Sequence, residues 1–323
     1  MLDHTTRISE ETQTEINRRA KSTRRIKLDN LSGIFPATVS TFDVDGKFDP
    51  VSMRRIVRHQ IDAGVHGLYV CGGTGEGLLM NSKERQNLLE TVLDETRGDV
   101  TVIAHVGAFQ IPETIALAQH ASGIGVDAIS ALPPSYFYKP DEISQINYYK
   151  SIAEVSEVPL LIYNIPQRTG ISMTESLYNE LIQIDNVIGM KDSSGDIYTL
   201  GHLASKWKDS VIFEGEDSLL LPSLIAGAGG GIGASYNLMP KLYVQLWEAY
   251  QGNNIDKAAK IQARVNEVIR ALLISPDLIG GIKQVLEWMD LECGPPLSPN
   301  RTLKSEEAAK LRQAFNDIGF FDN

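Results

Sequence analysis

PLLIYN (159–164) and VIGMK (187–191) are short apolar runs that each end on a polar side chain. Runs of this length and composition are typical of strands that are buried on both faces of a parallel sheet. The segment between them, 175–184, has apolar residues at helical spacing. Together the three segments predict one strand-helix-strand unit.

The same alternation continues on both sides of this unit and predicts eight strands. They are GIFPATVST (33–41), GLYV (67–70), VTVIAHV (100–106), DAISAL (127–132), PLLIYN (159–164), VIGMK (187–191), VIFEG (211–215) and GGIGAS (230–235). The amphipathic segments between them include 52–63, 83–96, 111–123 and 142–154. Four further helical segments follow the last strand, at 241–250, 255–273, 281–290 and 305–316.

Eight strand-helix units over about 220 residues match the usual size of a closed eight-stranded barrel. A doubly wound open sheet is the alternative, but it concentrates its ligands at one switch point. Here polar residues follow the strand ends all along the chain, as a shared site above a barrel requires. We therefore expect an α/β protein with a (β/α)8 TIM barrel over 33–236. A charged N-terminal extension (1–32) would precede it, and the last barrel helix and a C-terminal helical appendage (237–323) would follow.

Composition limits the classes of function. The chain has 30 basic and 41 acidic residues, a formal charge of -11, which disfavours a nucleic-acid-binding surface. Cys71 and Cys293 are too few for a disulfide framework, which favours a reducing compartment. No segment has the apolar run of a secretion signal or of a membrane-spanning helix. We expect a soluble, cytoplasmic protein without a nucleic-acid or membrane partner.

Lys191 is the lysine that ends an apolar strand, in VIGMKDSSGD (187–196). A lysine that projects into a barrel filled with apolar side chains is poorly solvated, which favours the neutral amine that attacks carbonyl groups. A surface lysine at a strand end is the alternative. Tyr163 favours the first interpretation, because it ends the preceding strand and its phenol can converge on the same site as a proton relay.

CGGTGEG (71–77) follows the second strand and has the glycines that let backbone amides approach an anion. It lacks the Gly-Lys-Ser/Thr ending of a phosphate loop, so we interpret it as a carboxylate nest. A purely structural turn remains the alternative.

Other chemistries are not indicated. The histidines show no metal-ligand spacing, and His105 and His120 fit packing or surface positions better than ligand positions. A serine hydrolase would need a Gly-x-Ser-x-Gly elbow, and the chain has none. We expect no metal and no nucleotide cofactor.

Five motifs at successive strand ends resemble the dihydrodipicolinate synthase and N-acetylneuraminate lyase superfamily, from about residue 33 to residue 303. They are CGGTGEG (71–77), YNIPQRTG (163–170), IGMKDSSGD (188–196), GEDS (215–218) and GGGIGASYN (229–237). The resemblance implies a class I aldolase in which Lys191 forms a Schiff base and Tyr163 relays protons. It also implies a homotetramer, a dimer of dimers, with small-molecule substrates.

The resemblance further assigns residues to the substrate. Gly73 and Thr74 would hold the carboxylate of the 2-oxo acid, and the backbone of Ile232 would lie beside the pyruvyl group. Tyr136 would lie at a subunit contact near the site. The remaining substrate-binding positions that it implies are Arg168, Ser193, Gly215, Asp217 and Ser218.

Departures from the superfamily pattern leave the substrate open. Gly73 stands where dihydrodipicolinate synthases carry the first of two hydroxyl residues, whereas Arg168 matches the arginine that binds their aldehyde substrate. Ser218 and Ala234 replace an acidic residue and a serine of sialic acid lyases. The stretches that favour the lyase branch cover more of the chain: VIAHVGAF (102–109), AISALPPSYF (128–137), KDSSGD (191–196), GIGASYN (231–237) and GGIKQVLEWMD (280–290).

The sequence therefore predicts a Schiff-base lyase, similar to N-acetylneuraminate lyase, that cleaves a 2-oxo sugar acid to pyruvate and an aldehyde. Three alternatives stay open. The first is a dihydrodipicolinate synthase that condenses pyruvate with aspartate semialdehyde. The second is a 2-keto-3-deoxy sugar acid aldolase or dehydratase, and the third is a 2-oxo acid sensor without catalysis.

Overall fold

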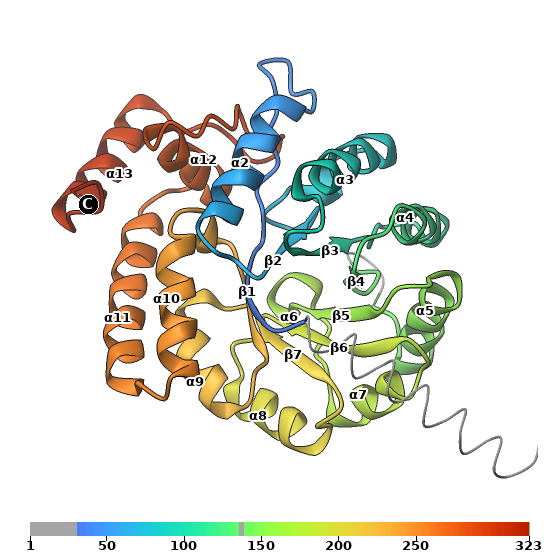
Figure 1. Cartoon of the computed structure of the whole chain (residues 1–323). Helices are drawn as coiled ribbons and strands as arrows, with labels where there is room; N and C mark the ends of the chain where they lie inside the picture. The colour runs from blue at the N-terminus through green and yellow to red at the C-terminus, as the bar shows by residue number, and fades with distance from the viewer. Residues whose placement is uncertain (1–30, 136–138, 323) are drawn as a thin grey trace, which may run out of the picture.

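Eight parallel strands form a barrel in the computed structural model, which describes residues 31–135 and 139–322 (Figure 1). The strands are β1 (Gly33–Pro36), β2 (Gly67–Val70), β3 (Thr101–His105), β4 (Ala128–Ala131), β5 (Leu160–Asn164), β6 (Val187–Asp192), β7 (Val211–Glu214) and β8 (Gly230–Gly233). Seven of the eight lie within their predicted strands, and β6 extends one residue beyond its predicted end, to Asp192. The predicted α/β barrel is confirmed.

The strand order is β1-β8-β7-β6-β5-β4-β3-β2, so each strand pairs with its sequence neighbour and β1 also pairs with β8. The barrel closes between β1 and β2 at a single bridge, Ala37 to Tyr69. There the N–H of Thr38 donates to the carbonyl of Tyr69 over 3.0 Å. This closure excludes the open sheet that we considered as the alternative, because an open sheet leaves its two edge strands far apart.

Helices cover the outside of the barrel, and the C-terminal helices pack beside it (Figure 1). The barrel helices are α2 (Pro50–Asp62), α3 (Ser82–Thr96), α4 (Ile111–Gly123), α5 (Glu142–Val155), α7 (Glu175–Ile182), α8 (Ile197–Lys206), α9 (Leu220–Ala226) and α10 (Pro240–Gln251), and the single turn α6 (Pro166–Thr169) lies in the loop after β5. The C-terminal appendage consists of α11 (Ile255–Leu272), α12 (Leu278–Trp288) and α13 (Ser305–Asp317). Short 3-10 turns lie at Gly77–Leu79 (η1), Asp217–Leu219 (η2) and Ser235–Asn237 (η3).

Local signals in the sequence explain where several helices begin. The Asp49 carboxylate accepts from the N–H groups of Val51 and Ser52, and Pro50 occupies the first turn of α2, where its missing N–H costs nothing. Asn81 and Glu84 form a reciprocal capping box at the start of α3. These caps fix where each helix leaves the loop at the carboxyl end of its strand.

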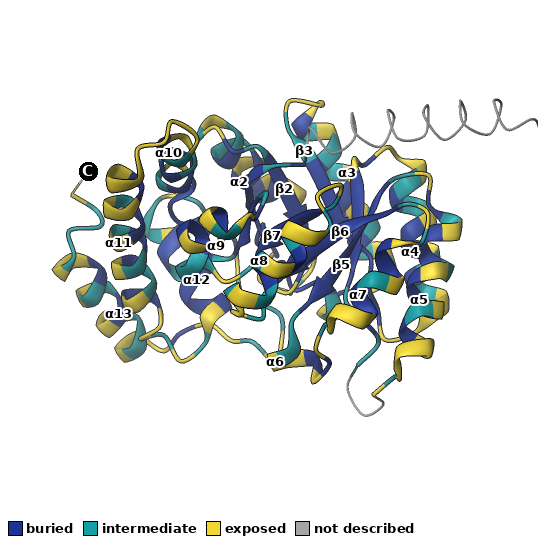
Figure 2. Ribbon diagram, turned by 90° about the horizontal axis from the view of Figure 1, so that it is seen from below, coloured by how far each residue is buried: buried dark blue, intermediate teal, exposed yellow. Residues whose placement is uncertain are grey.

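The core has two layers. An inner cluster fills the barrel with side chains that include Leu31, Phe35, Tyr69, Leu161 and Phe213. A larger outer cluster lies between the strands and the helices, so the strands are buried on both faces (Figure 2). Strands covered on both faces have the near-continuous apolar sequences from which they were predicted.

Within residues 31–135 and 139–322, no helix combines the length and the apolar character that crossing a bilayer requires.

Candidate active site

Lys191 and Tyr163 lie side by side at the carboxyl end of the barrel. They are Cα partners on β6 and β5, and both side chains are buried, 4% and 6% exposed. The Lys191 amine lies 4.2 Å from the centroid of the Tyr163 ring. No oxygen atom of the described residues accepts a hydrogen bond from this amine or forms an ion pair with it. The buried amine of Lys191 therefore lies beside the Tyr163 phenol and has no hydrogen-bond or ion-pair partner among the described residues.

A β-bulge helps to set this register. The pairing of β5 with β6 shifts between Leu160 and Leu161, which pair with Val187 and Gly189. Ile188 is the extra residue, and it lies in the inner cluster. Because a bulge changes which side chains face inward, this shift decides that Lys191 points into the barrel.

Tyr69 on β2 is the second aromatic side chain at the amine. Its ring centroid lies 4.5 Å from the Lys191 amine and 6.1 Å from the Tyr163 centroid, in an edge-to-face arrangement. The hydroxyl of Tyr69 donates to Ser130 Oγ on β4 over 3.2 Å, which fixes the ring. Burial raises the pKa of the Tyr69 phenol well above its usual value, so this hydroxyl stays protonated.

His105 on β3 packs edge-to-face against Tyr163, with 5.9 Å between the ring centroids. Its Nδ1 lies 3.2 Å from the carbonyl of Cys71, and its Nε2 accepts from the N–H of Leu132 over 3.4 Å. Burial, together with the positive charges of Arg85 and Lys191, lowers the pKa of His105 well below its usual value. A neutral imidazole with its proton on Nδ1 satisfies both contacts.

The predicted carboxylate nest lies on the loop after β2. Gly73 is exposed and Thr74 is half-buried, and space is open above the Gly73 Cα. The N–H groups of Gly73 and Thr74 have no acceptor among the described residues. Two non-glycine residues in this loop, Cys71 and Glu76, adopt the left-handed region with φ of 59° and 55°. Such backbone is costly unless neighbouring contacts hold it.

A buried ion pair holds the nest loop to the appendage. The Glu76 carboxylate lies 2.7 Å from the Lys283 amine on α12, and their side chains are 0% and 3% exposed. The other Glu76 oxygen accepts from the N–H of Leu297 (2.6 Å) and from Asn300 Nδ2 (3.1 Å). The main-chain N–H of Glu76 donates to the carbonyl of Gly73 over 3.1 Å. The C-terminal region is therefore part of what shapes the nest.

The predicted substrate residues of strands six to eight also meet at this end. Gly215 and Ser193 lie in close contact, since a Cβ at Gly215 would lie 2.0 Å from Ser193 Oγ and would force that side chain to move. The Asp217 carboxylate accepts from both the N–H and the hydroxyl of Ser235, each over 2.6 Å, and thereby ties the β7 loop to the β8 loop. Burial raises the pKa of Asp217. Ser218 donates to Glu216 Oε1 over 2.9 Å.

The other predicted positions differ in how they are placed. Ile232 is fully buried on β8, where it pairs with Phe35 of β1 and belongs to the inner cluster. Arg168 is exposed on α6, and its guanidinium makes no hydrogen bond or ion pair with the described residues. Tyr136 lies outside the described residues.

Two buried carboxyls, Asp192 and Glu214, are Cα partners on the ends of β6 and β7. Asn164 Nδ2 donates to Asp192 over 2.8 Å, and the Ser223 hydroxyl donates to Glu214. Burial raises the pKa of both, that of Glu214 to about 7. Protonation of Glu214 thus relieves the repulsion between two adjacent buried carboxylates.

This arrangement predicts a pH-dependent stability. A carboxyl whose pKa is raised on folding binds its proton more tightly in the folded state, so stability is lost as pH rises from about 4.5 through 7. Between pH 5 and pH 8.5 we expect Glu214→Gln to gain roughly 2 to 3 kcal/mol relative to the wild type. Urea unfolding at both pH values measures this difference.

The exposed carboxyl of Glu180 offers a matched control, and Glu180→Gln should show no such pH-dependent gain. An equal difference between Glu214→Gln and the wild type at the two pH values would contradict the assignment.

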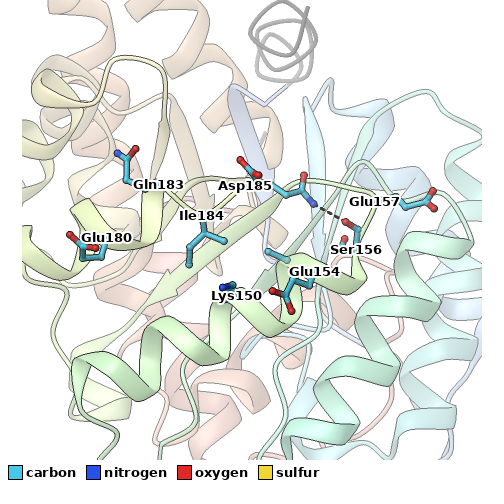
Figure 3. Close-up of a pocket in the computed structure, with 10 residues that line it drawn as sticks. Lys150, Glu154, Ser156, Glu157, Glu180, Gln183, Ile184 and Asp185 are labelled. Carbon is cyan, nitrogen blue, oxygen red and sulfur yellow. Dashed lines mark hydrogen bonds between the residues drawn. The ribbon is translucent and has the colours of Figure 1, made fainter. Parts of the chain in front are cut away.

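A surface pocket of about 490 Å³ lies between α5 and α7 and is lined by acidic side chains that include Glu154, Glu157 and Asp185 (Figure 3). Asn186 Nδ2 donates to the Ser156 carbonyl over 2.9 Å at its edge. These residues lie in the last turn of α5, just after it or just before β6, so the pocket opens at the amino end of the barrel. It is therefore remote from Lys191, which lies at the carboxyl end.

Within 31–135 and 139–322, no group of three or more His, Cys, Asp and Glu side chains has metal-binding geometry.

Tyr69 and Ser130 are residues of the site that the sequence did not single out. Both lie inside apolar strands, where a tyrosine or serine is indistinguishable from an ordinary core residue. Period-two alternation was the available signal: Ser130 follows Ala128 of the inner cluster by two residues, and Tyr69 follows Gly67, which packs against Phe35 of that cluster, by two. His105 is a packing residue as predicted, and the surface that it packs against is Tyr163.

Comparison with known proteins agrees with the resemblance that the five motifs indicated. A model of the dihydrodipicolinate synthetase family matches residues 30–318. N-acetylneuraminate lyase of Citrobacter koseri is 38% identical over 276 residues, which are 84% of this chain and 92% of the relative. N-acetylneuraminate lyase 2 of Escherichia coli O6:H1 is 36% identical over 285 residues, which are 87% and 93% of the two chains.

A solved structure, the catalytic lysine mutant of Ruminococcus gnavus sialic acid aldolase, superposes with a TM-score of 0.87 at 32% identity. The superposition covers 91% of this chain and 97% of that one.

Proposed function

The chain belongs to the dihydrodipicolinate synthetase family, as its motifs indicated, and from this premise we propose that it reversibly cleaves a 2-oxo sugar acid to pyruvate and an aldehyde. Its relatives include N-acetylneuraminate lyases and a sialic acid aldolase, so the predicted class, a class I aldolase of the lyases, is confirmed. The Lys191 amine carries the proposal, because it is buried, has no acceptor among the described residues and lies 4.2 Å from a tyrosine ring.

In the proposed reaction, Lys191 attacks the C2 carbonyl of the substrate and loses water to form a protonated imine. The Tyr163 phenol passes its proton to the departing water in that step; its oxygen then takes the proton of the C4 hydroxyl, and the C3–C4 bond breaks to release the aldehyde. The bonding electron pair moves into the iminium and gives an enamine. Protonation of C3 and addition of water at C2 then release pyruvate and regenerate the amine.

Two further groups of residues are proposed to hold the substrate. The N–H groups of Gly73 and Thr74 would bind the 2-oxo acid carboxylate, with the backbone of Ile232 beside the pyruvyl group. Ser193, Gly215, Asp217 and Ser218 would face the hydroxylated tail. Because Ser218 carries no charge and is tied to Glu216, we propose a shorter or differently oxidised tail than that of a sialic acid.

A panel of sugar acids tests the substrate. N-acetylneuraminate, several 2-keto-3-deoxy sugar acids and the pair of pyruvate with aspartate semialdehyde should be compared by coupled assays. We expect pyruvate release from at least one sugar acid. Silence with every sugar acid, together with consumption of the semialdehyde, would instead establish the synthase.

That synthase is the second candidate because of one observation: the Arg168 guanidinium is exposed and has no partner among the described residues. A free guanidinium binds carboxylates in a bidentate manner, as an incoming semialdehyde would need. A 2-keto-3-deoxy sugar acid dehydratase and a 2-oxo acid sensor complete the alternatives. A sensor that binds reversibly through the nest would form no reducible adduct with Lys191.

Tyr163→Phe should separate proton transfer from imine formation. Without the phenolic hydroxyl, kcat is expected to fall about 10²- to 10³-fold, whereas pyruvate should still be trapped on Lys191 by cyanoborohydride. Tyr149→Phe is the matched control, since Tyr149 is also buried but its hydroxyl donates to the Ala131 carbonyl. Unchanged kcat in Tyr163→Phe would rule out the relay.

The proposal includes the context of the enzyme. We propose a cytoplasmic homotetramer, assembled as a dimer of dimers, with Tyr136 at a subunit contact near the site. It would act on small molecules and need neither a metal nor a nucleotide, because the covalent imine is the electron sink.

A further inference from the structure

We propose that Tyr69 is a second functional aromatic residue of the Schiff-base site, whose ring face stabilises positive charge on the Lys191 nitrogen. The inference rests on the proposed function. The amine lies 4.5 Å from the centroid of the Tyr69 ring and 4.2 Å from that of Tyr163. Both rings therefore lie against the nitrogen, Tyr163 from β5, the strand next to that of Lys191, and Tyr69 from the more distant β2.

The face of Tyr69, rather than its hydroxyl, is directed at the nitrogen. The hydroxyl is engaged with Ser130 Oγ at 3.2 Å. Gly72 permits this pose, since a Cβ at that position would lie 2.5 Å from Tyr69 Cε1. The Tyr163 ring packs edge-to-face against the Tyr69 ring, with 6.1 Å between their centroids, and this contact restricts the orientation of the Tyr69 ring.

The chemistry needs such a face. The imine of Lys191 must be protonated to accept the electron pair of the breaking C–C bond, and the resulting cation is buried. A desolvated cation over an aromatic ring is stabilised more than one in water, because the ring competes with no hydration shell. No carboxylate of the described residues forms an ion pair with this nitrogen. Two π faces therefore supply attraction without the permanent negative charge that would suppress loss of the amine proton.

The other ionisable groups around the nitrogen are few. The Tyr163 ring lies against it from β5, and the charge of Lys191 also acts on His105 of β3 and on Asp217 of η2. The two contacts of the His105 ring are satisfied by a neutral imidazole, and the Asp217 carboxylate is bound by Ser235. Tyr69 is thus the aromatic side chain at the nitrogen that the proposed proton relay does not already use.

The test compares Tyr69→Phe, which keeps the face and loses the hydroxyl, with Tyr69→Leu, which loses both. The measured quantity is the pyruvate adduct trapped by cyanoborohydride, followed by intact mass as a function of pH, because this reagent reduces the protonated imine. We expect the profile of Tyr69→Leu to shift by about one pH unit toward lower pH. The profile of Tyr69→Phe should stay within about 0.3 unit of the wild type, well below that cation–π shift.

Phe35→Leu is the control for lost packing, because Phe35 is an equally buried inner aromatic that makes no cation–π contact with Lys191. It should lower the melting temperature without moving the profile. If Tyr69→Leu does not fold, Tyr69→Met replaces the ring with a flexible side chain of similar volume. The role of the ring face would be overturned if the pH profile of adduct trapping did not shift in Tyr69→Leu or Tyr69→Met. It would also be overturned if Tyr69→Phe shifted the profile as far as Tyr69→Leu does. Absence of any adduct in the wild type would instead refute the proposed function.

Discussion

Lys191→Arg is expected to abolish pyruvate release, with kcat/KM lower by roughly four orders of magnitude or more. Arginine keeps much of the length of the side chain, but its guanidinium is never deprotonated in proteins and forms no imine. The variant should bind pyruvate reversibly and gain no mass on reduction. Initial rates and intact mass after borohydride treatment measure both effects.

Lys206→Arg is the matched control for this substitution. Lys206 is exposed, pairs with Glu175 and lies 4.6 Å from the ring of Trp207, so it also combines an ion pair with an aromatic contact. It should keep full activity and the pyruvate adduct at Lys191. A borohydride-trapped adduct in Lys191→Arg would show that another amine performs the chemistry.

Lys283→Met is expected to have the largest effect on stability, about 3–5 kcal/mol in the free energy of unfolding. The substitution leaves the buried Glu76 carboxylate without its ion-pair partner, and a buried charge without compensation is far more costly than the lost pair itself. Because Glu76 also closes the Gly73–Thr74 turn, the KM for the 2-oxo acid should rise. Urea unfolding and steady-state kinetics measure the two effects.

Adding Glu76→Gln to Lys283→Met should restore a large part of the stability. Glutamine removes the unpaired charge, and its carbonyl oxygen can still accept from Leu297 and Asn300. Lys206→Met is the surface control and should cost at most about 1 kcal/mol, as is usual for exposed ion pairs. A loss in Lys283→Met no greater than in Lys206→Met would contradict the role assigned to the buried pair.

The sequence by itself determined the barrel and the two residues to which we assign the chemistry. The strands could be predicted from their apolar runs because every strand is covered on both faces. Lys191 and Tyr163 could be predicted because each stands at the end of such a run. In a parallel barrel all strand ends meet at one edge, so position along the chain was sufficient to bring these two side chains together.

Only the tertiary structure decided what surrounds the pair. Tyr69 reaches the Lys191 amine from across the barrel, and Lys283 reaches Glu76 from a helix more than 200 residues further along the chain. Neither contact follows a local period, since each depends on the closure of the barrel and on the docking of the appendage. Strand periodicity records which face a side chain takes, but it does not record which distant side chain it meets there.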